Sequence, residues 1–220
     1  MASRLESILS RSSDMEATVY HDRCLELLIP ALSRSEDTYD DNLLVTVIIL
    51  RLHEELDSHK DQKLHLLGSH RLLNSISQYS SSGGLGEAAS WQFLRQAIYV
   101  CLVQKEPWQL RLEHYGQSKV FERSDDASYA NAMIFLFAKI LQLISQPIDH
   151  GYSSHEWDLL RESVDRWKTE QPCSFIPLKY RGPDVDEGRP FSEIWMISPA
   201  AGKLPYFLNL YLRLIPSVFP

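Results

Sequence analysis

The sequence predicts an all-α fold, in the form of an irregular multi-helix bundle with a proline-rich loop near the C-terminus. Apolar residues recur at helical spacing in several long segments, whereas the alternating patterns of β-strands are scarce. The joints between these segments are polar or contain proline, and they vary in length. Varied joints and wide apolar faces favour an irregular bundle over an up-down four-helix design.

The first predicted helix runs from Asp14 to Leu32 and follows a flexible segment formed by residues 1–13. Asp14 is the predicted N-cap. Pro30 is expected to kink or interrupt the last turn, because proline removes a backbone donor and clashes with the preceding turn. The apolar stripe of this helix comprises Tyr20, Cys24, Leu27, Leu28, Ala31 and Leu32.

The second predicted helix runs from Asp41 to about Ser58 and is central and buried. Its first half, from Leu43 to Leu50, is apolar on all sides and rich in β-branched residues, which would also suit a buried strand. The apolar pattern continues at helical spacing through Leu52 and Leu56, and strands rarely run past about ten residues. Length therefore favours a helix.

Two further helices are predicted over residues 62–79 and 87–105, on either side of a flexible serine- and glycine-rich joint at 80–84. The fifth begins at Asp125 or Asp126 and is closed by Pro147. The sixth begins with a capping box, in which Ser153 and Glu156 satisfy each other's backbone donors.

Prolines and glycines interrupt the helical pattern over residues 172–192. We expect an extended loop there, packed on the helices through Phe175, Ile176 and Tyr180, followed by a short apolar stretch at 194–197. The chain is therefore divided into the flexible segment 1–13, a helical domain over 14–201 and an atypical tail over 202–220.

Composition suits a folded domain and limits its partners. The hydrophobic fraction of 44% suits one globular domain or a large piece of a bigger protein. The net charge of −7 would repel phosphate groups, so no direct binding to nucleic acids is expected, and basic patches for anionic membranes are lacking. The longest apolar run is shorter than the ~20 residues that span a bilayer. We expect a soluble intracellular protein.

The search for chemistry predicts no catalytic, cofactor-binding or metal-binding residue, and the chain is not expected to be an enzyme. Cys24, Cys101 and Cys173 are too far apart for a disulfide framework or zinc cluster. His53-Glu54 begins like a zinc-protease helix, but the second ligand position is Asp57.

Other candidate groups are explained more simply as structure or solvated surface. These are the histidines at 59, 65 and 70, Ser69, the glycines at 83–86, and the carboxylate pairs at 54–55, 125–126 and 184/186. The five tryptophans are interpreted mainly as core.

Seven pieces of the sequence, in order over about residues 14–200, resemble the fungal-specific transcription factor domain. This helical region follows the DNA-binding zinc cluster in the fungal zinc binuclear cluster transcription factors. The matching pieces are 20–32, 40–56, 65–69, 91–99 with 111–113, 156–157 with 167, 172–175, and 194–195.

The resemblance implies a regulatory region, without catalytic residues, that acts in RNA polymerase II transcription. It implies localisation to the nucleus, with the cytoplasm as a second location, and zinc only in a missing N-terminal cluster. Protein partners or a small-molecule effector are expected, and self-association is possible. The alternative is a stand-alone helical interaction or adaptor domain. The tail 202–220 does not fit the family pattern, and we expect it to arise from intron read-through after a truncated gene.

Overall fold

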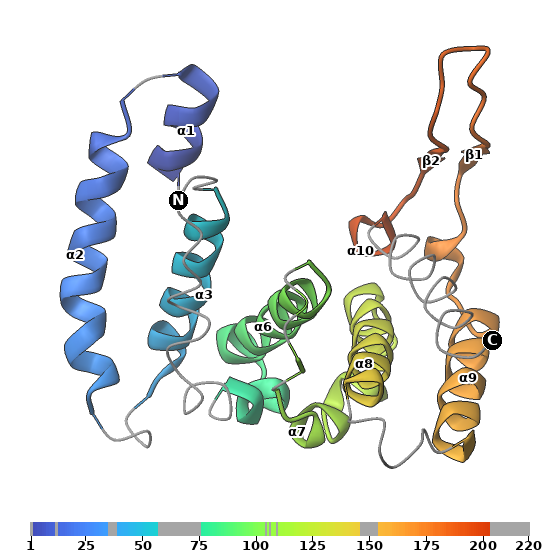
Figure 1. Ribbon diagram of the computed structural model, residues 1–220. Coiled ribbons are helices and arrows are strands. Elements are labelled where there is room, and N and C mark those ends of the chain that lie inside the picture. Colours follow the sequence, from blue (N-terminus) through green and yellow to red (C-terminus); the bar gives the residue numbers. More distant parts are fainter. Residues whose placement is uncertain are drawn as a thin grey trace. The chain divides into compact units, whose positions relative to one another are not determined.

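The computed structural model describes residues 2–11, 13–34, 39–56, 76–103, 105, 107–108, 110–145 and 154–202. These residues are helical apart from short loops and one two-stranded hairpin, so the predicted all-α class is confirmed (Figure 1). Residues 62–75 of the helix predicted over 62–79, the capping residue Ser153 and the tail after Gly202 lie outside the described residues.

The chain forms two compact units where the sequence predicted one helical domain. Unit 1 comprises Met1–Gln96 and Glu113–Gln117, and unit 2 comprises Ala97–Leu112 and Ser118–Pro220. The division falls inside helix α6, Gly84–Val103. No linker of distinct composition marks it, which is why sequence patterning could not locate it.

Unit 1 begins with helix α1, Ala2–Ser10, where a flexible segment was predicted. This helix packs against α2, Met15–Leu32, and α3, Asp41–Leu56. Asp14 occupies the N-cap position of α2 as predicted, but its side chain makes no capping hydrogen bond and pairs with Arg4 of α1 instead. The contact with α1 thus replaces the local cap that the sequence predicted.

Helix α2 continues through Pro30 to Leu32. Pro30 lies in the last turn, where few backbone bonds remain to be lost, and the amide of Ser33 still donates to the carbonyl of Ile29 at 3.2 Å. The predicted apolar stripe is only partly buried: Leu28 is in the core, whereas Tyr20 and Leu27 are exposed. Those two residues lie seven positions apart along one flank of the helix.

The segment whose first half would also have suited a buried strand forms the helix α3, as the length of the segment predicted. Leu44, Val47, Ile48 and Leu50 are buried, together with the side chain of Arg51. The carboxylate of Asp40 caps the helix by accepting a hydrogen bond from the amide of Leu43 at 2.8 Å. Four apolar residues on one helix make α3 a large part of the core of unit 1.

The predicted flexible joint at 80–84 is a packed turn. Its first half is a 3-10 helix, η2, Tyr79–Ser81, in which Ser80 is buried and donates to the carbonyl of His114 at 3.0 Å. The indole of Trp91 donates to the carbonyl of Ser80 at 3.2 Å. Tertiary hydrogen bonds therefore order a stretch whose composition suggested a linker.

The joint ends at Gly83 and Gly84, whose φ angles of 77° and 60° favour glycine. Helix α6 starts there, three residues earlier than predicted, and close packing continues at Gly86. A Cβ atom at Gly86 would lie 2.6 Å from a carboxylate oxygen of Asp41 and 2.9 Å from the Tyr79 ring. The amide of Gly86 donates to Asp41 at 3.1 Å, so the starts of α3 and α6 are joined.

The short helix α7, Glu113–Gly116, completes unit 1. Its Tyr115 is fully buried against Trp91, with ring centroids 5.2 Å apart in an edge-on arrangement. The Tyr115 hydroxyl donates to the carbonyl of Ser90 at 2.9 Å and accepts from the Ser90 hydroxyl at 3.0 Å. Both hydrogen-bonding functions of this buried hydroxyl are thereby used.

Unit 2 contains the 3-10 helix η3, Lys119–Glu122, followed by the helices α8, Asp126–Ile144, and α9, Ser154–Thr169. The predicted start of α8 is confirmed: Asp125 is the N-cap and accepts from the amide of Ser128 at 2.9 Å. Among the described residues, α8 alone is long and apolar enough to cross a membrane, but half of that stretch is buried in the protein. A core helix has the same properties.

Three aromatic rings join the start of α8 to the end of α9 and to the 3-10 helix η5, Cys173–Phe175. Tyr129 stacks on Trp167 at 4.7 Å, and Phe175 meets the Tyr129 ring at 4.8 Å. The Tyr129 hydroxyl donates to the carbonyl of Trp167, whose indole donates back to the Tyr129 carbonyl at 3.0 Å. Trp91, Trp157 and Trp167 are buried, as the prediction of core tryptophans required, whereas Trp108 is half-buried and Trp195 is exposed.

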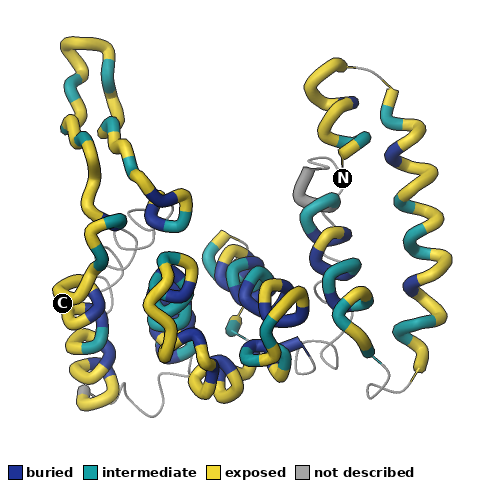
Figure 2. Tube along the Cα trace, turned by 180° about the vertical axis from the view of Figure 1, so that it is seen from behind, coloured by how far each residue is buried: buried dark blue, intermediate teal, exposed yellow. Residues whose placement is uncertain are grey.

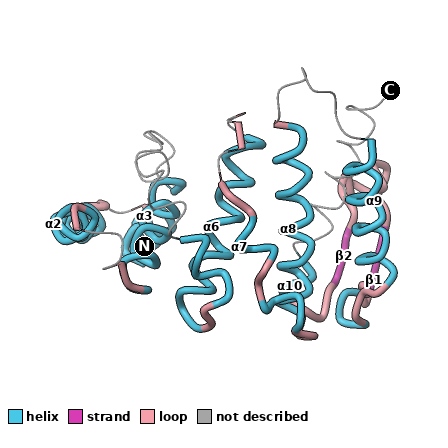
Figure 3. The backbone as a smooth tube through the Cα atoms, turned by 90° about the horizontal axis from the view of Figure 1, so that it is seen from below, coloured by secondary structure: helices cyan, strands magenta, loops and turns pink. Residues whose placement is uncertain are grey.

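After η5 the chain of unit 2 forms a hairpin, which we call the arm and define as residues 176–198. Strand β1, Lys179–Arg181, pairs antiparallel with β2, Glu193–Trp195, and the short helix α10, Pro199–Gly202, follows. β1 and β2 are the only strands among the described residues (Figure 3). The arm runs away from the helices of its unit (Figure 1) and is mostly exposed (Figure 2).

The structure of the arm differs from the extended, packed loop that was predicted for this part of the chain. Phe175 is buried as expected, but Ile176 and Tyr180 are exposed and do not pack on the helices. Asp184 and Arg189 form a bridge near the tip, and Gly188, with a φ of 72°, completes the turn. The strands were missed because three residues each are too few to show an alternating pattern.

Candidate functional site

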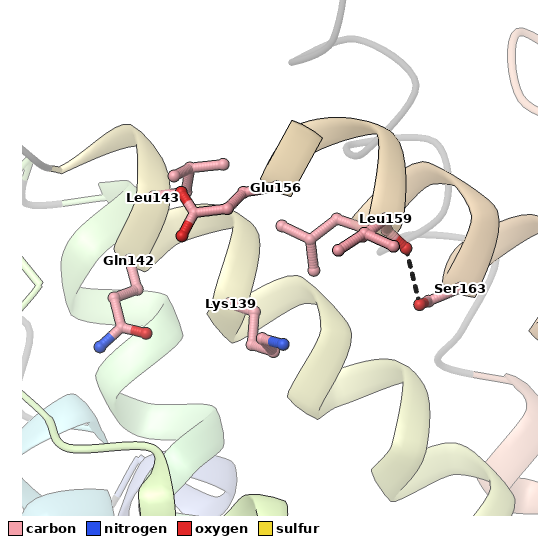
Figure 4. Close-up of a pocket in the computed structure, with 7 residues that line it drawn as sticks. Lys139, Gln142, Leu143, Glu156, Leu159 and Ser163 are labelled. Atoms are coloured by element: carbon pink, nitrogen blue, oxygen red, sulfur yellow. Dashed lines mark hydrogen bonds between the residues drawn. The ribbon is translucent and has the colours of Figure 1, made fainter. Parts of the chain in front are cut away.

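A groove lies between α8 and α9 within unit 2 (Figure 4). Its volume is about 330 Å³. Figure 4 shows Lys139 and Gln142 of α8 facing Glu156 and Leu159 of α9. The remaining lining residues are Leu143, Leu160 and Ser163.

The chemistry of this groove suits binding better than catalysis. It combines apolar leucine side chains with one cation, one carboxylate and one amide, which can orient a polar ligand. Its hydroxyl group, on Ser163, donates to the carbonyl of Leu159 at 2.8 Å, so it is engaged with the backbone of its own helix. Among the described residues that line the groove, there is no histidine or cysteine to activate or replace that hydroxyl as a nucleophile.

A second groove, of about 200 Å³, lies between α2 and α3 within unit 1. Its polar lining includes His21, Cys24 and His53. The two imidazole rings are stacked with centroids 5.0 Å apart and 23° between their planes, so they meet face to face. Metal ligation needs ring nitrogens that converge on one point, and no metal-holding group of three is found within the described residues.

The sequence candidates that lie within the described residues are far apart in the chain. His53 lies in the α2–α3 groove, whereas Asp57, Ser69 and the histidines at 59, 65 and 70 fall outside the described residues. The glycines at 83–86 open α6, but the Glu87 carboxylate accepts from the amide of Gly83 at 3.0 Å. A carboxylate therefore occupies the position where a phosphate would need that donor.

The thiol of Cys101, in helix α6, is half-buried. Burial raises the pKa of Cys101, and a hydrogen bond with Ser145 opposes the shift only in part. A raised pKa keeps the thiol protonated and weakens it as a nucleophile. This side chain therefore behaves as part of the packing between its neighbours.

The paired aspartates at 125–126 are structural, as predicted. Hydrogen bonds from Ser128 lower the pKa of Asp125 at the helix N-terminus. Hydrogen bonds from Ser174 and then Ser198 lower the pKa of Asp126. Ser174 precedes the arm and Ser198 ends it, so one carboxylate joins both ends of the arm to α8.

The surface that sequence analysis missed is the arm itself. The register pairs Tyr180 with Ile194, which places them on one face together with Leu178, two residues before Tyr180. These side chains are exposed. The only signal in the sequence was a few apolar residues between prolines, which resembled a packed loop.

The other face of the arm is closed by polar contacts. The ammonium group of Lys179 bonds the Glu193 carboxylate at 3.0 Å and lies 4.6 Å from the centre of the Trp195 ring. The Trp195 indole donates to the same carboxylate at 2.8 Å. One face is thus held by charge and the other is left apolar and open.

Comparisons with known proteins found no matching protein-family model, no matching curated protein and no matching solved structure.

Proposed function

We propose that this chain is the regulatory, non-DNA-binding region of a fungal zinc-cluster transcription factor, acting through contacts with other proteins or a small effector. The observation that carries this proposal is the ordered series of seven sequence pieces resembling that domain. The net charge of −7 and the helical fold are consistent with it. The α8–α9 groove offers a place for a small effector, and the arm offers a protein-binding surface.

A reporter assay in yeast tests the regulatory role directly. The chain is inserted between an unrelated DNA-binding domain and a strong activation domain, and reporter output is compared with that of an unrelated acidic helical domain of equal length. We expect the regulatory region to change output several-fold, with the fusion located in the nucleus and equally abundant. Equal output from both fusions would contradict the proposal.

The alternative, a stand-alone helical adaptor, is favoured by the exposed apolar arm. Genomic DNA upstream of the reading frame separates the two. Six closely spaced cysteine codons that splice in frame to this chain would support the transcription factor, because a binuclear zinc cluster needs clustered thiolates. A promoter directly upstream, with no such codons, would support the adaptor.

A further inference from the structure

The walls of the α8–α9 groove are two helix faces that are fixed to each other. The residues that line it recur at helical spacing, at 139, 142 and 143 on α8 and at 156, 159, 160 and 163 on α9. The stacked rings of Tyr129 and Trp167 join the start of α8 to the end of α9. The two helices are therefore antiparallel, and the groove lies toward their other ends. Because packed rings hold the pair together, the groove is formed before a ligand enters it.

The floor of the groove is apolar and its size is small. Leu143 and Leu160 are buried, and Leu159 beside them is 49% exposed. The volume of about 330 Å³ is at the lower end of the range for ligand pockets, which is roughly 300–1,000 Å³. The groove therefore suits a small molecule, and the leucines favour a ligand with an apolar body.

Two opposite charges stand on the two walls, with Lys139 of α8 facing Glu156 of α9 (Figure 4). The Lys139 ammonium group lies 5.8 Å from the centre of the Phe135 ring and forms no ion pair with any of the described residues. Glu156 already has a contact within the protein, but a carboxylate can accept about four hydrogen bonds. Both groups can therefore pair with charges on a ligand.

These two charges restrict the class of ligand. A simple anion would be attracted by Lys139 and repelled by Glu156, and a simple cation would meet the reverse. A neutral apolar molecule would take both charges out of water without pairing either, which is costly. A zwitterion gives each charge a partner of opposite sign while its carbon body covers the leucines.

We propose that the α8–α9 groove binds a small zwitterion that carries one ammonium group, one carboxylate and an apolar carbon body. The ammonium group pairs with Glu156, the carboxylate pairs with Lys139 and the Gln142 amide, and the body packs on Leu143 and Leu160. This inference deepens the proposed function, on which the role of the ligand as an effector rests. The binding itself depends only on the groove.

The first experiment titrates two zwitterions into the full isotope-labelled chain and follows the amide signals of α8 and α9 by NMR. Leucine holds both charges at one end of its carbon body, and ε-aminocaproate holds them at opposite ends. At least one of the two should bind and move the signals of the groove. Analogues with a single charge should bind about fivefold more weakly or worse. They are isocaproate and isoamylamine for leucine, and caproate and hexylamine for ε-aminocaproate.

Charge variants provide the second test. Lys139→Glu should weaken binding of the zwitterion about fivefold or more, because two carboxylates then face each other in the groove. Combining Lys139→Glu with Glu156→Lys should recover most of the affinity, since a zwitterion can bind in the reverse direction. The matched control, Lys168→Glu, makes the same change at an exposed residue of α9 outside the groove and should bind like the wild type.

The proposal is overturned if neither zwitterion moves the signals of α8 and α9, or if the analogues with one charge bind as tightly. It is also overturned if the exchange of charges recovers no affinity while the amide spectrum remains that of a folded chain. The yeast reporter distinguishes this inference from the proposed function. A chain that regulates the reporter but binds neither probe contradicts the ligand assignment alone.

Discussion

The buried hydroxyl of Tyr115 links a single residue to the pH dependence of stability. Burial raises the pKa of Tyr115, and the hydrogen bond with Ser90 opposes the shift only in part. The folded state therefore holds this proton more tightly than the unfolded state. Its contribution is complete below the unfolded pKa of about 10 and is lost as the pH rises through the higher folded value.

Replacing Tyr115 with phenylalanine should lower the free energy of unfolding at neutral pH by about 1–3 kcal/mol, because buried groups of Ser90 lose a partner. The difference in the free energy of unfolding should shrink above about pH 10. There the unfolded wild type ionises Tyr115 while the folded wild type keeps it protonated, which lowers the stability of the wild type only. Urea unfolding at several pH values measures both effects. The exposed Tyr99→Phe is the control, and a difference that stays constant at alkaline pH would refute the explanation.

Tyr129 shows what local sequence could and could not predict for a single residue. Its place on the apolar face of α8 followed from helical spacing. Its environment did not, because burial among rings from two later segments, followed by the charge of Glu170, raises the pKa of Tyr129 to about 12. Contacts with Trp167 and Phe175 depend on how distant segments meet, which spacing alone does not encode.

At the scale of elements, a helix start was predicted well where the capping residue and the amide that it binds lie close together in the sequence. The cap of α8 lies within three residues of the bond it makes, so Asp125 and Ser128 could be recognised together. Helix α1 was missed because nine residues are too few for a helix that is stable alone, and its order comes with contacts to α2 and α3. The arm was missed because its prolines and glycines indicated a loop.

The attachment of the arm should depend on the ionised Asp126. Hydrogen bonds from Ser174 and Ser198 lower its pKa, so this contribution is present above the unfolded value of about 4 and is lost as the pH falls through the lower folded value. Asp126→Ala should therefore raise hydrogen exchange over residues 176–198 several-fold at neutral pH. Wild-type protein should show the same loss of protection only in acid.

Asp158→Ala, on the exposed side of α9, is the matched control for that experiment. It removes one carboxylate from the same unit without touching the base of the arm. If both alanine variants exchange like the wild type, Asp126 does not hold the arm. If both raise exchange equally, the effect is one of net charge.

At the scale of the molecule, each unit has its own core. Leu44 is fully buried in unit 1 and Met133 in unit 2. Truncating either should cost about 2–5 kcal/mol, because each leaves a cavity. Leu44→Ala should therefore speed hydrogen exchange mainly in unit 1 and Met133→Ala mainly in unit 2. Equal effects of each variant on both units would show that they unfold as one.

Because both ends of the arm attach at one place, the length of the arm can change in evolution without disturbing the helices. Since Ser174 and Ser198 reach the same carboxylate, the chain leaves the helical body and returns to it at nearly one place. Such a segment can be shortened, lengthened or exchanged for another hairpin without moving the helices that flank it. The arm is thus a natural point of insertion, at which related sequences could differ in length while keeping the same helical body.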